Sequence, residues 1–324
     1  MKTLTLFCFL IINLSQLFSQ NTDSTRLLVL EMIDILSKNA SYKEKISTAF
    51  LTEKMDSLLI VKKDSLRKVP YLFVDYLKYY GDSHVAYFSP RKESQKTKEL
   101  PIDKMPKLMI LDSQFGYIKI PSFSTRNELD YFFYSESVNA FIHKIKAKYN
   151  PKGWIIDFRN NEGGYAISML SSLYPFLIHF DLYASHSEKD MNTKINKGKM
   201  LNKYHKKNIV HPDLLPSLKS FSDSPKIVVL INKNTASAGE ISAMVLSNLP
   251  NTILMGDSTM GLMTAMKHFN LYNGGKINIP IGYLCDAKGK CPDRVYPNFY
   301  YNDDEILDKA KKWILEKDMQ NITH

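Results

Sequence analysis

Residues 226–240 read KIVVLINKNTASAGE, and residues 157–164 read DFRNNEGG. In each case a short run of β-branched and apolar residues stops in a turn of small and polar residues, and a helix-like pattern follows. A turn of this kind can present a hydroxyl, here that of Ser237, beside free backbone N–H groups, which acyl transfer requires. Two such turns in one chain favour a serine hydrolase.

Strand and helix patterns alternate from Lys107 onward, which predicts an α/β fold with a mainly parallel sheet. The expected strands cover residues 116–121, 153–158, 227–232 and 252–255, and the expected helices cover residues 127–149, 166–174, 240–249 and 305–317. Before this core, residues 21–89 show helical apolar spacing and residues 90–106 form a polar, Lys-rich linker. The predicted core is therefore 107–324, and its Lys-rich stretch 186–225 is expected to be a lid or a solvated insertion.

Residues 1–20 combine a positive start with an apolar run of about ten residues, as a secretory signal peptide does. The run is too short to span a membrane, so we expect no transmembrane span. The sequence therefore predicts an exported protein, periplasmic or extracellular.

The formal charge of +10 is spread along the 324 residues, which fits solubility or an acidic surface partner better than nucleic-acid binding. The sequence contains no P-loop, zinc-finger spacing or G-x-G-x-x-G. We therefore expect no nucleic-acid partner, no metal and no organic cofactor, whereas composition does not indicate the oligomeric state.

Cys285 and Cys291 are the cysteines that remain after removal of the signal peptide. They flank a Gly-containing turn in a predicted strand–turn–strand segment, and in an oxidising compartment they could clamp it. The alternative is two free thiols. A metal site fits less well, because no second Cys or His pair has matching spacing.

Four motifs resemble those of the C-terminal processing peptidase and tricorn core protease family. Residues 157–164 are similar to its D-L-R-x-N-x-G-G, residues 234–241 to its nucleophile turn, residues 256–261 to its G-x-x-T-x-G, and Pro292-Asp293 to its tail. They occur in the family's order within about 107–317. The resemblance implies a ClpP/crotonase-like catalytic core behind a small helical N-terminal domain. It also implies a serine-type endopeptidase that hydrolyses peptides or unfolded proteins, here without room for a PDZ domain in the linker.

The general base implied by this resemblance is a histidine. Leu262 stands where the processing peptidases carry a lysine, and an isobutyl group accepts no proton; Lys267 is a weak substitute. The tricorn-like branch uses a histidine before the core, and Ser83-His84 resembles its Ser-His pair. Imidazole suits the task because it titrates near neutrality. The alternative is that His84 only caps a helix.

The same branch carries an acid shortly before Pro-Asp that reaches the histidine through a serine. Asp286 occupies that position, so the resemblance implies Asp286 with Ser83 as the relay. A turn aspartate that caps the hairpin is the alternative. Glu240 is a second acid near the nucleophile, which the start of a helix explains equally well.

For the oxyanion hole the expected donors are the N–H of Ala238 and that of Gly163 or Gly164. Asp157 and Arg159 are expected to shape the loop, and Asn161 to brace it through hydrogen bonds to backbone.

A rival interpretation is a catalytically inactive, peptidase-like domain that binds a peptide or a hydrophobic small ligand. The resemblance extends to the retinoid-binding repeats of photoreceptor matrix protein, and the Met-rich residues 255–266 could line a pocket. Such a stripe is more often core.

Overall fold

A computed structural model describes most of the chain between residues 22 and 316. The described ranges are 22–80, 83–90, 105–124, 128–177, 180–185, 191–196, 199–202, 207–208, 220–285 and 291–316. The expected signal peptide lies outside them. The chain forms two units, Met1–Ser94 with Thr264–Gly282 and Gln95–Met263 with Tyr283–His324.

The second unit is built on a six-stranded sheet. Its strands, in spatial order, are β13 (Phe299–Tyr300), β10 (Thr252–Gly256), β9 (Lys226–Ile231), β4 (Gly153–Asp157), β3 (Phe115–Lys119) and β2 (Lys107–Leu111). All neighbours are parallel except β2, which runs antiparallel to β3. The prediction of an α/β fold with a mainly parallel sheet is therefore confirmed.

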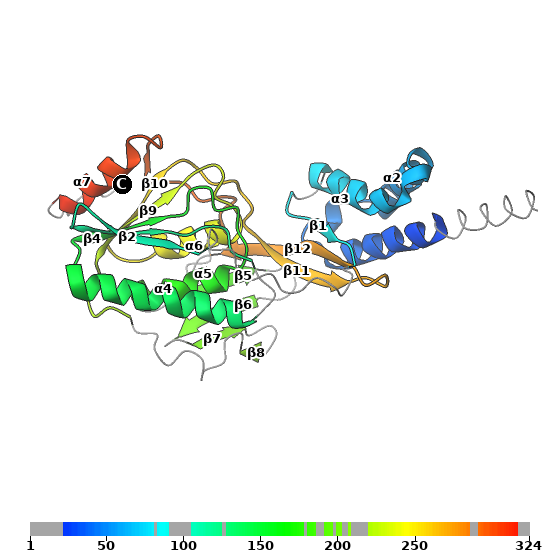
Figure 1. Ribbon diagram of the computed structural model, residues 1–324. Helices are drawn as coiled ribbons and strands as arrows, with labels where there is room; N and C mark the ends of the chain where they lie inside the picture. Colours follow the sequence, from blue (N-terminus) through cyan, green and yellow to red (C-terminus); the bar gives the residue numbers. More distant parts are fainter. Residues whose placement is uncertain are drawn as a thin grey trace, which may run out of the picture. The chain divides into compact units, whose positions relative to one another are not determined.

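Helices cover both faces of this sheet (Figure 1). Helix α7 (Ile306–Leu315) lies on one face, and α4 (Glu128–Tyr149) and α5 (Ala166–Ser172) lie on the other. Helix α6 (Ala238–Ser247) follows β9 and packs against β9 and β10. Burial on both faces explains why the central strands are almost continuously apolar.

The strand period of two assigns neighbouring residues to opposite faces. Ile155 packs with Ile314 of α7, whereas the Trp154 ring packs against Phe176 and Phe221, with centroids 5.1 and 6.2 Å away. Helix α5 ends at Ser172, and a 3-10 turn, η4 (Tyr174–Phe176), takes in the proline that the sequence predicts as its stop.

The Lys-rich excursion carries strands of its own where it is described. Strands β5 (Phe180–Ser185), β6 (Met191–Asn196), β7 (Lys199–Asn202) and β8 (Lys207–Asn208) pair antiparallel in that order. Strand β5 also pairs with the end of β12 (Lys276–Cys285), between Tyr283 and Cys285. Strands β6, β7 and β8 of the 186–225 stretch thus form an antiparallel sheet with β5, which lies just before that stretch.

The first unit combines the expected helices with strands that the sequence did not predict. Its helices are residues 22–39, α2 (Thr48–Val61) and α3 (Val69–Tyr80), with 3-10 turns η1 (Lys43–Lys45) and η2 (Lys63–Lys68). Strand β1 (Ala86–Phe88) pairs antiparallel with β12, and β11 (Thr264–Asn270) also pairs with β12. The N-terminal unit therefore includes residues 264–282, which the sequence-based boundary at residue 89 leaves in the core.

Among the described residues, no helix has both the length and the apolar character needed to cross a membrane.

Candidate active site

Ser237 stands in the turn between β9 and α6. Its φ is +50°, a conformation that non-glycine residues rarely adopt and that clusters at functional sites. The residue is half-buried and is the N-cap of α6. The strand, strained turn and helix form the arrangement in which hydrolases present a nucleophilic serine.

The buried carboxylate of Glu240 holds this turn in place. Its Oε2 accepts the N–H groups of Ser237 and Leu262, both at 2.7 Å. Its Oε1 accepts the Thr259 hydroxyl at 2.6 Å and the Gly261 N–H at 2.7 Å. Glu240 is fully buried, so it supports the turn and links it to the 259–262 loop. Of the two interpretations of Glu240, the structure favours a residue at the start of a helix, because its carboxylate accepts the N–H of Ser237, the N-cap of α6.

Two glycines allow close approaches of a second turn, Gly163 to Ser237 and Gly164 to Phe123. Gly163 has a φ of +105°, and a Cβ there would lie 2.8 Å from the Ser237 Cβ and 3.3 Å from the Ala238 N. Gly164 has a φ of +132°, and a Cβ there would lie 1.9 Å from the Phe123 O. Only glycine permits both the conformation and this approach.

The N–H groups of these turns are not equivalent. Gly163 donates its N–H to Asn161 Oδ1 at 2.8 Å, so that donor is used within the loop. Asn161 in turn donates to the carbonyls of Ile120 and Pro121 at 3.0 and 3.2 Å, which is the bracing expected of it. In the described part of the chain, neither Gly164 N–H nor Ala238 N–H makes a hydrogen bond, so these two are the candidates for the predicted oxyanion hole.

An ionic network shapes the loop that bears the glycines. Asp157 is fully buried at the end of β4 and accepts from Tyr117 at 2.7 Å, Lys119 at 3.1 Å and Arg159 at 2.7 Å. Burial alone would raise the Asp157 pKa, but hydrogen bonds from Arg159 and the charges of Lys119 and Arg159 hold it below its ordinary value. Arg159 also pairs with Asp303 at 2.8 Å. These contacts are those expected of residues that shape the loop.

The predicted base and its neighbour belong to the first unit. His84 Nδ1 lies 2.9 Å from Oγ1 of Thr264, the first residue of β11. Ser83 is exposed and has no hydrogen-bond partner among the described residues. Asp286 lies outside the described residues, so the expected relay through Ser83 stays a prediction.

Lys267 and His268 are the residues in which a base would be sought if His84 is not the base, and both have neighbours of their own. The Lys267 ammonium lies 4.9 Å from the Phe269 ring centroid. His268 is exposed, with its ring 6.4 Å from that of Phe88. Leu262 takes part in the site only through its backbone N–H, which Glu240 accepts.

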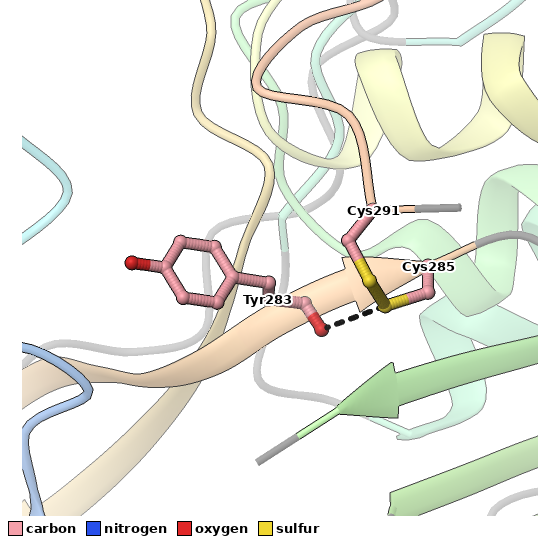
Figure 2. Close-up of a disulfide and its surroundings, with 3 residues drawn as sticks. All are labelled: Tyr283, Cys285 and Cys291. Carbon is pink, nitrogen blue, oxygen red and sulfur yellow. Dashed lines mark hydrogen bonds between the residues drawn. A yellow bond between two sulfur atoms is a disulfide. The ribbon is translucent and has the colours of Figure 1, made fainter. Parts of the chain in front are cut away.

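Cys285 and Cys291 form a disulfide at the end of β12, as Figure 2 shows. The Cys285 sulfur lies 3.7 Å from the Tyr283 carbonyl oxygen. The predicted disulfide is confirmed. The hairpin that it was expected to clamp is not seen in the described residues, because residues 291–298 form no strand and the next described strand, β13, pairs with β10 instead.

The Met-rich stretch proposed to line a ligand pocket is divided between core and surface. Met255 and Met263 are each only 2% exposed, and Met255 packs in the cluster formed with α7, whereas Met266 is half-buried and Met260 is 45% exposed. A cavity of about 460 Å³ in the first unit and one of about 190 Å³ in the second are lined by other residues. This weakens the small-ligand interpretation of residues 255–266.

Two contributors to this geometry were missed from the sequence. The role of Glu240 as a hub depends on donors around residue 260, and the motif spacing from 237 to 261 could have indicated that contact. Thr264 carries no sequence signal, since its partner His84 is 180 residues away.

The chain belongs to peptidase family S41, whose model matches residues 114–300, more than half of the 324 residues. This is the family of the C-terminal processing peptidases, so the resemblance seen in the motifs is confirmed.

Two curated relatives are each 28% identical to it. The nisin-resistance protein of Lactococcus lactis subsp. lactis aligns over 206 residues, 61% of this chain and 58% of that protein. The carboxy-terminal processing protease CtpA of Bacillus subtilis (strain 168) aligns over 200 residues, 61% of this chain and 36% of that protein. The match thus spans less than two thirds of either relative.

Solved structures share the fold. A lipoprotein from Streptococcus agalactiae has a TM-score of 0.69 at 20% identity, over 90% of this chain and 96% of that one. The photosystem II D1 C-terminal processing protease has a TM-score of 0.57 at 13% identity, over 86% and 93%.

Proposed function

We propose that this chain is a serine-type endopeptidase that hydrolyses peptides or unfolded proteins. The observation that carries the proposal is the strained Ser237 turn, packed on Gly163 and flanked by the N–H groups of Ala238 and Gly164, which make no hydrogen bond to the residues that the structure describes. Membership of a peptidase family, with one relative named a carboxy-terminal processing protease, supports the same reaction class.

In the proposed reaction the Ser237 Oγ attacks the peptide carbonyl while His84 accepts its proton. The resulting oxyanion receives hydrogen bonds from the N–H groups of Ala238 and Gly164. His84 then gives the proton to the departing amine, and water resolves the acyl-enzyme by the same steps. The proposal requires Ser237 and His84 to meet during the reaction.

We also propose that the protein is exported. The N-terminal apolar run supports this, as does the Cys285–Cys291 disulfide, since disulfides persist in oxidising compartments. One structural relative is described as a lipoprotein.

The test is labelling with a serine-reactive fluorophosphonate, together with hydrolysis of a denatured protein. Wild type should be labelled and active, whereas Ser237→Ala should fold normally and lose both properties. An inactive binding protein would take no label. Activity that survives Ser237→Ala would remove this nucleophile.

A pH profile tests the base. Activity should rise through the range in which histidine ordinarily titrates, about pH 6.5, and His84→Ala should lose most of the rate. A rise far above neutrality that does not depend on His84 would indicate a lysine instead.

A further inference from the structure

The His84 ring is held by a hydroxyl from a distant part of the chain. Its Nδ1 lies 2.9 Å from Thr264 Oγ1. The Thr264 hydroxyl lies 3.5 Å from Sδ of Met266, with the geometry of a donor. All three residues belong to the first unit and are half-buried.

The direction of the His84–Thr264 bond depends on where the hydroxyl proton points. If the hydroxyl donates to Met266, its oxygen accepts from an Nδ1–H and Thr264 makes both hydrogen bonds. If it donates to Nδ1 instead, the bond from Thr264 to sulfur is lost and Thr264 keeps one. The imidazolium carries protons on both nitrogens, so it permits only the first arrangement.

We propose that Thr264 is a positioning residue which, with Met266, holds His84 in the Nδ1–H tautomer. The inference rests on the proposed function. In this tautomer Nε2 carries the lone pair that takes the Ser237 proton. The hydroxyl keeps one orientation before and after the transfer, because Met266 receives its proton in both states. A neutral hydroxyl thereby occupies the place at Nδ1 where a catalytic triad has a carboxylate.

The tautomer is measured directly by long-range ¹H–¹⁵N correlation of the imidazole rings in the labelled full chain above the histidine titration range. His84→Gln identifies the His84 signals. Wild type and Thr264→Ser should show Nδ1–H, and Thr264→Val should shift the population toward Nε2–H. An Nε2–H tautomer in wild type, or no shift in Thr264→Val, would overturn the inference. This readout does not depend on catalysis.

Steady-state kinetics give the second measurement. Thr264→Val should lower kcat about tenfold with KM unchanged, which is roughly the effect of one hydrogen bond. Thr264→Ser should restore the rate, and Met266→Leu should lower it less than Thr264→Val does. The matched control is Thr52→Val, which removes a hydroxyl in the same unit that donates to the Thr48 carbonyl.

An equal fall of kcat in Thr52→Val and Thr264→Val would contradict a positioning role. If Ser237→Ala itself kept wild-type activity, the proposed function would fail while the tautomer result would stand. The two failures are therefore distinguishable.

Discussion

The backbone of Ser237 carries about 1–3 kcal/mol of strain at its φ of +50°. Such a conformation persists when neighbouring groups determine it. Here the Ser237 N–H donates to Glu240 and the Ser237 Cβ rests against Gly163, so the hydroxyl is aimed by contacts on two sides. The position of the proposed nucleophile thus depends on residues that need not touch substrate.

Replacement of Gly163 tests that dependence. Gly163→Ala should lower the free energy of unfolding by about 2 kcal/mol and abolish hydrolysis, because its Cβ would meet the Ser237 Cβ at 2.8 Å. The matched control is Gly274→Ala, which also has a positive φ, +81°, but whose Cβ would have no neighbour nearer than 3.8 Å. Urea unfolding and peptide hydrolysis measure both. If both variants lost the same stability and activity, the positive φ alone would explain the result and the contact with Ser237 would not.

Asp157 should make stability depend on pH. Its pKa is lowered in the folded protein, so its contribution is complete above the unfolded pKa and disappears as pH falls through the folded pKa. Asp157→Asn should be less stable by about 3 kcal/mol at pH 7, because Lys119 and Arg159 lose a buried counter-charge. The difference from wild type should narrow below about pH 4.

The control is Asp223→Asn. The Asp223 pKa is also lowered, by a hydrogen bond from Lys146, but this carboxylate is 54% exposed. Its loss should cost less than about 1 kcal/mol. If the free energies of unfolding of Asp157→Asn and wild type differed by the same amount at acidic pH as at pH 7, the lowered pKa of Asp157 would be contradicted.

At the scale of elements, the sequence predicts those helices and strands whose own residues show the pattern, without reference to a distant partner. Strands β4 and β9 are buried on both faces, so their apolar runs reveal them without reference to any partner. Helix α7 shows its core face as Ile306, Ala310 and Ile314. These elements were predicted to within a few residues.

The missed elements depend on distant partners. Strand β11 mixes exposed, half-buried and buried residues, including Lys267 and His268, and becomes a strand by pairing with β12. Strand β1 has three residues and pairs with β12, which lies about 190 positions along the chain. The contact between His84 and Thr264 depends on the same pairing of segments, so no local pattern could reveal it.

The link between α6 and the 259–262 loop gives the next prediction. Glu240→Gln should lower the free energy of unfolding by about 2 kcal/mol or more and reduce hydrolysis. The amide nitrogen that replaces one carboxylate oxygen cannot accept a hydrogen bond. Two of the four donors therefore lose their acceptor, whichever way the amide is oriented. Glu305→Gln, at the exposed N-cap of α7, is the control and should change little. Thermal unfolding and hydrolysis measure both. Wild-type stability in Glu240→Gln would remove Glu240 as the support of the turn.

At the scale of the whole molecule, the first unit is assembled from two separate stretches of chain. Strand β1 pairs with β12 from Ala86↔Asn278 to Phe88↔Lys276. Ser41 donates its N–H to the Pro280 carbonyl at 2.9 Å. Ile277 and Ile279 of β12 are fully buried. A shortened chain of residues 101–324 would expose these side chains and leave one edge of β12 unpaired, so we expect it to aggregate and to lack activity.

Cutting the chain should have a different effect from truncating it. A specific protease site inserted after Lys98, once cleaved in the folded protein, should leave two fragments that co-elute in native buffer and separate only in denaturant. The reason is that residues 264–282 carry the covalent link to the second unit while they pair with the first. Hydrolysis by the cleaved protein should stay near that of the uncut insertion variant, since Thr264 and His84 remain together. If the fragments separated in native buffer, β1 and the N-terminal helices would not bind β12 once the linker is cut. That result would contradict the assembly of the first unit from residues 1–94 and 264–282.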